Sequence, residues 1–311
     1  MNKEVLFTMN TGFRDDYTLK AFRFGKGEKA ACIVGAMRGN EYQQLYICAK
    51  LIEQLKELEQ KGAIVAENEI LVIPSINSNS MNVGKRFWVT DNSDINRQFP
   101  GNKEGEATSR AAAAVMEAVK GYSYGIQFAS FYLEGEFIPH IRMMETGYES
   151  RSLANLFGLP YVITGKSRAF DKTTLNYNWQ LSGTSAFSLY TGATDRINEK
   201  QAQEAVASVL RFLMRMGIIR YHCHNGYIAS VLDETELVSV HSERAGFLVR
   251  KKEINDEVKR GDVLAEIIDP YDCSVRAKIL APVDGIIFFT QTSPMVYQNS
   301  SIFKIIKKLH R

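Results

Sequence analysis

The chain has 311 residues, 45% of them hydrophobic, and its 38 basic and 35 acidic residues give a formal net charge of +3. This length and hydrophobic content predict one large α/β domain with a well-buried core plus a small second domain, and they exclude a disordered chain. The nearly balanced charge argues against nucleic acid or an anionic membrane as a partner.

The start of the chain and its cysteines indicate the cytoplasm. The first seven residues lack the apolar core of a signal peptide, and no segment approaches the roughly 20 apolar residues that span a bilayer. Cys32, Cys48, Cys223 and Cys273 show no CxxC spacing, and the first two lie in apolar runs. We therefore expect a cytoplasmic protein with four reduced thiols and no membrane contact.

Strands and helices are predicted to alternate from about residue 29 to residue 219. The apolar run at 29–35 predicts a buried strand, and the apolar stripe that follows predicts a helix over 41–60 with Asn40 as its N-cap. Alternation of this kind predicts a mostly parallel sheet that is covered by helices on both faces, with ligands beyond the carboxyl ends of its strands. The further elements are strands at 70–74, 124–131, 160–164 and 185–190, and helices at 106–120 and 199–216.

The pattern changes after residue 219, where short β-type runs and glycine turns replace the helices. We therefore place an α/β domain at 1–219 and a small all-β domain at 220–311. The spacing of turns and strands from 245 to 287 is similar to that of barrel-sandwich modules of the biotinyl and lipoyl type. The turn at 268–272 carries no lysine for a carrier group, so we expect this domain to serve as a wall of the site or as the surface of a homo-oligomer.

The segment 94–101, Asp-Ile-Asn-Arg-Gln-Phe-Pro-Gly, is the most informative part of the chain. It holds Asn96 and Arg97 in a loop that follows a buried strand. An amide and a bidentate cation are the groups that bind a substrate carboxylate and polarise a neighbouring carbonyl. This pattern favours hydrolysis of an acylated amino acid, with a purely loop-pinning role for the two side chains as the alternative.

This segment resembles the Asp-Leu-Asn-Arg-x-Phe-Pro-Gly signature of the succinylglutamate desuccinylase/aspartoacylase family, in the zinc carboxypeptidase-like clan. Residues 35–41, Gly-Ala-Met-Arg-Gly-Asn-Glu, are similar to the metal motif of that family, Gly-x-x-His-Gly-Asn-Glu. The resemblance covers nearly the whole chain. It implies a zinc-carboxypeptidase-like α/β domain, a small β domain, and cleavage of the amide of N-acyl amino acids or small peptides. It also implies that Arg86 binds substrate. We expect Arg142 and Arg168 to supply further cations at the carboxyl edge of the sheet, with Arg142 as another substrate contact.

The resemblance implies a zinc site with two histidines and a glutamate, and a catalytic glutamate that activates water. At these positions the chain has Arg38, Glu41, Ala129 and Tyr190, so only Glu41 is retained. A guanidinium has no free lone pair for a metal, and alanine has no ligating atom. We therefore doubt that zinc is bound and expect Arg38 to pair with Glu41, with its charge where the metal charge would be. A surface ion pair at a helix start is the alternative for Arg38.

Two further hypotheses concern the replaced groups. A relocated metal site built from Glu41, His140 and either Glu134 or Glu136 is chemically reasonable, although a lone histidine is more often a hydrogen-bonded pocket or core residue. Tyr190 either contacts a ligand or fills the space of the lost glutamate, because a phenol is a poor general base at neutral pH.

Three functions therefore remain open. The first is an amidohydrolase with a degenerate metal site. The second is a non-catalytic binding protein, a pseudoenzyme, that holds a carboxylate-bearing small molecule or peptide with Arg86, Asn96 and Arg97. The third is an enzyme with relocated or metal-independent chemistry. Arg38, Ala129 and Tyr190 are the residues that discriminate among them.

Overall fold

The computed structural model describes residues 1–12, 15–131 and 134–308, and the chain divides into two compact units. The larger unit comprises Met1–Ser130, Pro139–Tyr190 and Thr194–Val231, and the smaller unit comprises the rest. The larger unit extends past residue 219 because the segment up to Val231 leads into a strand of its sheet. Residues 131–138 fall in the smaller unit because a strand within them pairs there.

A nine-stranded sheet forms the centre of the larger unit. Its four central strands, β4, β3, β5 and β9, are parallel to one another, β7 runs antiparallel to β9, and an antiparallel hairpin, β1 and β2, forms one edge. The predicted mostly parallel sheet is confirmed, whereas the edge hairpin and β7 are additions that the sequence pattern did not indicate. In spatial order the strands are β1 (Asn2–Met9), β2 (Tyr17–Gly25), β4 (Asn68–Ser75), β3 (Glu28–Ala36), β5 (Tyr124–Ala129), β9 (Ser185–Tyr190), β7 (His140–Glu145), β8 (Tyr161–Lys166) and β10 (Ser230–Asp233).

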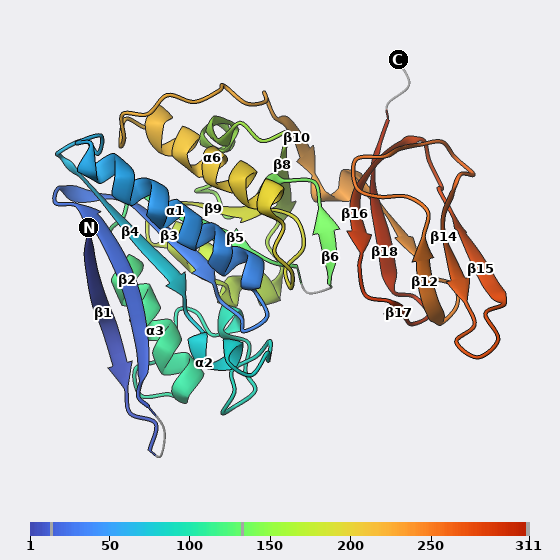
Figure 1. Cartoon of the computed structure of the whole chain (residues 1–311), viewed down its shortest axis with the longest axis horizontal. Coiled ribbons are helices and arrows are strands. Elements are labelled where there is room, and N and C mark those ends of the chain that lie inside the picture. The colour runs from blue at the N-terminus through green and yellow to red at the C-terminus, as the bar shows by residue number, and fades with distance from the viewer. Residues whose placement is uncertain (13–14, 132–133, 309–311) are drawn as a thin grey trace. The chain divides into compact units, whose positions relative to one another are not determined.

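Helices cover both faces of this sheet because side chains along each strand alternate between the faces. Ala31 and Ile33 of β3 pack in a core with α1 (Tyr42–Gln60) and α6 (Glu199–Arg215), which lie next to each other in Figure 1. Cys32 and Val34 pack in a second core with α3 (Ala107–Val119) and α5 (Leu175–Leu181). The sheet is thus buried on both sides, as expected for parallel strands.

The ends of the long helices follow from local sequence. Asn198 caps α6 by accepting a hydrogen bond from the Gln201 amide at 3.1 Å. The predicted cap Asn40 is wrong, because α1 is capped at Glu41 without a side-chain hydrogen bond. None of the described helices is both long and apolar enough to cross a membrane. The short helices are α2 (Ser78–Met81), α4 (Arg151–Ala154), η1 (Ile95–Arg97), η2 (Asn155–Phe157), η3 (Ala169–Thr173) and η4 (Glu234–Glu236).

Two antiparallel sheets make up the smaller unit. One contains β11 (Leu237–His241), β18 (Ser301–Lys307), β16 (Gly285–Gln291) and β13 (Glu257–Val258), and β6 (Gly135–Phe137) pairs with β16. The other contains β15 (Val275–Leu280), β14 (Val263–Ile268), β12 (Gly246–Arg250) and β17 (Met295–Val296). Side chains of both sheets, such as Ile267 and Ile287, share one apolar core. The unit is therefore a two-sheet sandwich, and its strands do not form a single closed barrel.

Candidate functional site

Four segments of the larger unit end at one place beside the central strands. Arg38 follows β3, Glu41 lies at the start of α1, Asp94 precedes η1, and Ser130 follows β5. Carboxyl ends of parallel strands meet at the same edge of a sheet, which brings these segments together. The side chains of these four residues form a single hydrogen-bonded network.

Arg38 is the centre of this network. Its Nη1 donates to Oε1 of Glu41 at 3.0 Å, and its Nε and Nη2 donate to the two carboxylate oxygens of Asp94, each at 2.9 Å. Arg38 is 5% exposed and Glu41 is 1% exposed. The predicted pair of Arg38 and Glu41 is confirmed, and because it is buried and bidentate on Asp94, the alternative of a surface ion pair is wrong.

The carboxylate of Glu41 has donors on both oxygens. Its Oε2 accepts hydrogen bonds from the backbone amides of Met37 at 2.7 Å and Arg38 at 3.2 Å. Its Oε1 accepts from Arg38 and from the hydroxyl of Ser130. Four donors therefore stabilise this buried charge, which leaves little capacity for a further cation.

The charges of the network stabilise one another. Burial by itself would lower the pKa of Arg38, but Glu41 and Asp94 outweigh that effect and raise it. Burial by itself would raise the pKa of Asp94, but Arg38 and then Arg97 outweigh it and lower the pKa. Both groups therefore stay ionised at neutral pH, and the network holds one guanidinium between two carboxylates.

These residues do not fit a zinc ion. A zinc at Glu41 would place two positive charges against the guanidinium of Arg38, which has no lone pair to offer as a ligand. Ala129 has no ligating atom, and its carbonyl oxygen already accepts from Nε2 of Gln44 at 3.3 Å. Across residues 1–12, 15–131 and 134–308, no three His, Cys, Asp or Glu side chains are grouped closely enough to hold a metal.

Ala129, Tyr190 and His140 lie side by side on three neighbouring strands. Ala129 of β5 is opposite Tyr190 of β9, and Tyr190 is opposite His140 of β7. The rings of His140 and Tyr190 are stacked, with centroids 5.0 Å apart and an interplanar angle of 8°. Tyr190 therefore packs against an aromatic neighbour beside the position that Ala129 leaves small, which agrees with a space-filling role.

The relocated metal site remains a prediction, because its candidate ligands belong to two different units. His140 is buried against Tyr190 and belongs to no group of three possible ligands. Glu134 and Glu136 belong to the smaller unit, where Gln291 pairs with Gly135 and Thr290 pairs with Glu136. The burial of His140 supports its role as a hydrogen-bonded pocket or core residue.

Asn96 fixes the loop to a helix. Its side-chain oxygen accepts a hydrogen bond from the amide of Leu175, the first residue of α5, at 3.1 Å. Its own amide donates to Asp94 at 3.0 Å. The loop-pinning alternative therefore holds for the side-chain oxygen of Asn96.

Arg97 is held differently. Its Nη1 donates to the carbonyl oxygen of Asn96 at 2.8 Å, and its guanidinium lies 5.4 Å from the centroid of the Phe170 ring. The guanidinium of Arg168 lies 4.5 Å from the same centroid, and Arg168 also contacts Asp171 at 3.3 Å. Two cations therefore flank one aromatic ring. Arg97 forms no ion pair within 4.0 Å in the described parts of the chain, although its charge lowers the pKa of Asp94.

Arg86 and Arg142 lie on separate segments. The carbonyl oxygen of Arg86 accepts from the amide of Gly39 at 3.1 Å, and the Arg86 guanidinium is 5.9 Å from the Phe87 centroid. A Cβ on Gly39 would lie 2.1 Å from the carbonyl oxygen of Lys85, so only glycine allows this close approach. Arg142 is half-buried on β7. A shared pocket for Arg86 and Arg97 remains a prediction.

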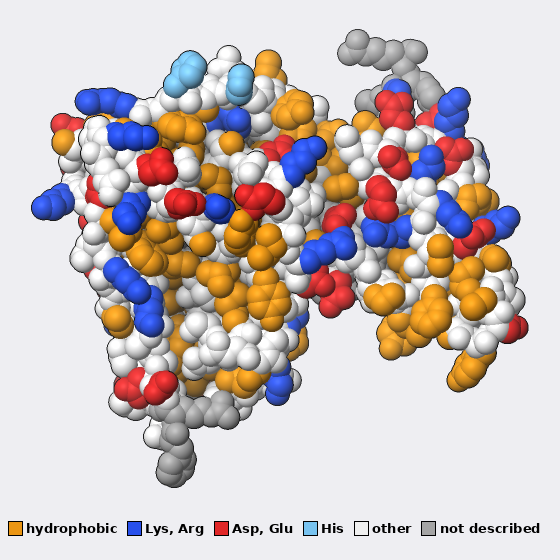
Figure 2. All heavy atoms as spheres, viewed as in Figure 1, with side chains coloured by type: hydrophobic (Ala, Val, Ile, Leu, Met, Phe, Trp, Pro, Cys, Tyr) orange, Lys and Arg blue, Asp and Glu red, His pale blue; other side chains and the backbone are white. Residues whose placement is uncertain are grey.

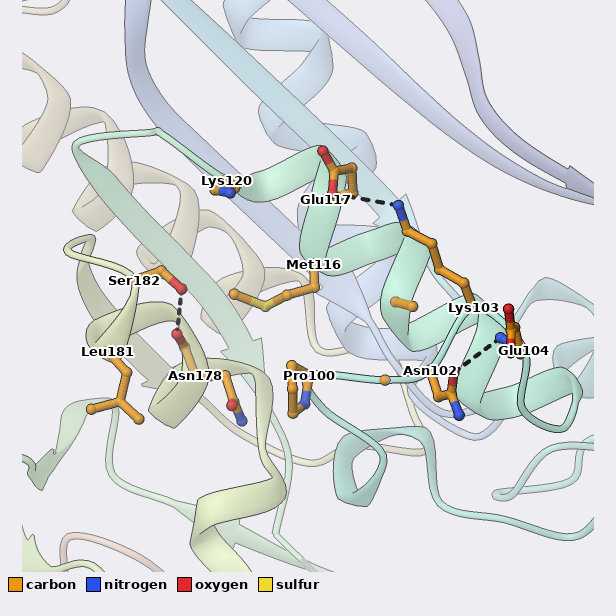
Figure 3. A pocket seen from close by; sticks show the side chains of 12 residues that line it. Pro100, Asn102, Lys103, Glu104, Met116, Glu117, Lys120, Asn178, Leu181 and Ser182 are labelled. Carbon is orange, nitrogen blue, oxygen red and sulfur yellow. Dashed lines mark hydrogen bonds and ion pairs between the residues drawn. The ribbon is translucent and has the colours of Figure 1, made fainter.

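A cavity of about 550 Å³ lies beyond the end of the same loop (Figure 3). Pro100 and the residues after it, one side of α3 and the end of α5 form its walls. Lys103 and Glu117 face each other across it at 3.9 Å in an exposed ion pair. None of the arginines discussed above lines this cavity, so it is separate from the Arg38 network.

Comparison with known proteins finds similarity to one family of enzymes. Residues 28–126, which include Arg38, Glu41, Asn96 and Arg97, match the model of the Succinylglutamate desuccinylase/Aspartoacylase catalytic domain. An N-alpha-acetyl-L-2,4-diaminobutyric acid deacetylase from Halomonas elongata is 22% identical over 273 residues, which cover 77% of this chain and 70% of that protein. The predicted family resemblance is confirmed.

Solved structures agree on the fold. A succinylglutamate desuccinylase/aspartoacylase from Rhodobacter sphaeroides has a TM-score of 0.78 and 17% identity, covering 95% of this chain and 91% of that one. The product-bound ectoine utilization protein EutE (DoeB) from Ruegeria pomeroyi has a TM-score of 0.79 and 15% identity, covering 94% of this chain and 90% of that one. At these identities the likeness establishes the fold.

Two residues of the network were missed by sequence reasoning. Asp94 lies inside the family signature, which marked its segment as part of the site. Its bidentate contact with Arg38 was not predictable, because the two residues are 56 positions apart in the chain. Ser130 lay inside the predicted strand at 124–131 and carried no further signal, whereas β5 ends at Ala129. It reaches Glu41 because β5 ends beside the start of α1.

Proposed function

We propose that this protein binds a carboxylate-bearing small molecule or peptide of the N-acyl amino acid type, without zinc-dependent hydrolysis. The observation that carries the proposal is the engagement of Arg38 with both Glu41 and Asp94. A permanent cation stands where the relatives' pattern has a metal-binding histidine. The fold of a deacylase is kept, but a fold by itself does not establish an activity.

Arg97 is the proposed receptor for the ligand carboxylate. Arg97 is partly buried, its guanidinium is oriented by the Asn96 carbonyl and by Phe170, and it forms no ion pair within 4.0 Å among the described residues. A carboxylate on such a guanidinium forms short, charge-assisted hydrogen bonds. Arg168 on the same aromatic ring adds a second positive charge, and Arg86 and Arg142 are proposed as further contacts of an acidic ligand.

The groups needed for hydrolysis are absent from the positions that would supply them. Arg38 stays protonated and cannot accept a proton from water. Glu41 already accepts four hydrogen bonds, and Tyr190 is stacked on His140 in place of a carboxylate. Each of these side chains is engaged within the protein, and none is placed as a general base.

The second candidate is hydrolysis of N-acyl amino acids. The name of the Halomonas elongata relative, a deacetylase, favours this activity, and so does the match to a deacylase catalytic domain. The two candidates predict opposite results for turnover of an acylated amino acid, and they agree on binding.

We expect Arg97→Ala to weaken binding of acidic ligands by about 1.5–3 kcal/mol, because it removes a charge-assisted contact. This corresponds to a roughly 10- to 150-fold increase in Kd. Isothermal titration calorimetry with N-acetylaspartate and succinylglutamate measures it. Arg151→Ala is the matched control, because Arg151 is an exposed arginine that pairs with Glu145 at 3.1 Å. Unchanged affinity for every acidic ligand in the Arg97 variant would show that the carboxylate binds elsewhere.

A further inference from the structure

The outer face of one sheet in the smaller unit bears an apolar row. The register places Met295 of β17 opposite Phe247 of β12, Phe247 opposite Ile268 of β14, and Ile268 opposite Val275 of β15. Met295, Phe247 and Val275 are 41%, 40% and 50% exposed. The row therefore runs across all four strands on the side that faces away from the core.

A neighbouring buried residue confirms which side this is, and two exposed tyrosines lie in the segments next to these strands. Ile267, one residue from Ile268, is fully buried in the core of the unit, as alternation along a strand requires. Tyr271, in the turn after β14, is 97% exposed, and Tyr297, just after β17, is 74% exposed. Figure 2 shows hydrophobic side chains gathered over the region where Figure 1 places β12, β15 and β17.

Such a patch indicates an interaction surface. Exposed apolar residues that are scattered singly are ordinary, whereas a contiguous patch on a soluble protein commonly marks a binding interface. Aromatic residues and methionine are also the residues enriched in protein interfaces. The row contains Phe247 and Met295 side by side.

The charges beside the row point to the kind of partner. On the same face Val249 is opposite Glu266, and Glu266 is opposite Lys278. Lys251 also contacts Glu266 at 3.0 Å. The row next to the apolar one therefore carries both signs of charge, which suits neither an anionic surface nor a uniformly charged peptide. In a two-fold arrangement, residue i contacts residue j and residue j contacts residue i, so Glu266 can meet Lys278 of the partner subunit at two symmetric positions.

We propose that a second copy of this chain docks on this surface, so that the protein is a dimer through the outer faces of its β15-β14-β12-β17 sheets. The apolar row forms the centre of the interface. Glu266 and Lys278 form its charged rim and set the two-fold register.

Sedimentation velocity on the full chain tests the apolar row. The wild type is expected to sediment as a dimer, and the double variant Phe247→Asp, Met295→Asp as a monomer. Val5→Asp is the matched control, because Val5 is 54% exposed on β1 of the other unit. It is expected to remain dimeric. Dissociation by Val5→Asp would place the interface on the edge strand instead.

Charge exchange tests the register without disturbing the core. Glu266→Lys and Lys278→Glu, each alone, place like charges across the two-fold axis and are expected to be monomeric. An equal mixture of the two variants restores both opposite-charge contacts and is expected to form a mixed dimer. A mixture that stays monomeric overturns the proposal, as does a wild type that is monomeric at its highest soluble concentration. Capture of a monomeric wild type by neutral phosphatidylcholine vesicles would assign the patch to a lipid surface.

Discussion

Replacing Arg38 with alanine is expected to lower the free energy of unfolding of the larger unit by about 3–5 kcal/mol, the range typical of breaking a buried ion pair by removing one partner. Glu41 is 1% exposed, so the variant leaves its carboxylate charged and short of its cation. Asp94 loses a bidentate partner at the same time. Urea unfolding followed by tryptophan fluorescence reports on this unit alone, because both tryptophans of the chain, Trp88 and Trp179, are buried within it.

Two comparisons isolate the cause of this loss. Arg151→Ala removes an exposed arginine with a single acidic contact and is expected to cost about 1 kcal/mol or less. Adding Glu41→Gln to Arg38→Ala removes the stranded charge and is expected to recover part of the loss, since the two residues are coupled. A loss below about 1 kcal/mol for Arg38→Ala would mean that the network contributes little to the fold.

Hydrolysis of N-acetylaspartate and succinylglutamate is expected to be absent or several orders of magnitude below the typical enzyme rate of about 10 s⁻¹. Ala129 supplies no ligand, Arg38 repels a metal ion, and Tyr190 supplies no carboxylate to activate water. Loss of one member of a cooperating catalytic set already removes most of the rate, and further losses add little. Release of the free amine, measured with and without added zinc, checks this result.

Glu41→Gln is the control for any residual turnover. A trace activity that survives both this substitution and a chelator does not come from a metal at this site. Chelator-sensitive turnover near 10 s⁻¹ that Glu41→Gln abolishes would contradict the proposed binding function and establish the amidohydrolase instead.

Local patterns were enough to predict most of the α/β core. The apolar stripe of α1 and the buried run of β3 are periodic over many residues, so each element is specified by its own segment. The meeting of Arg38 with the Asn96 loop followed from topology, because both lie beyond carboxyl ends of parallel strands. The Arg38 and Glu41 contact followed from their three-residue spacing.

Contacts between distant segments were not predictable in the same way. Arg38 and Ser130 are 92 residues apart, and Asn96 and Leu175 are 79 residues apart. Their pairing depends on how loops end after the sheet has formed, which no periodic pattern encodes. The same reason explains the insertion of β7 antiparallel beside β9 and the pairing of β6 with β16 in the smaller unit.

Zinc content per chain tests most directly the claim that Arg38 takes the place of the metal. The full chain is incubated with excess zinc, separated from free ion by gel filtration, and analysed for zinc and protein. The account predicts far less than one zinc per chain, and the same value for wild type and Glu41→Gln. One zinc per wild-type chain that is lost in Glu41→Gln would contradict it.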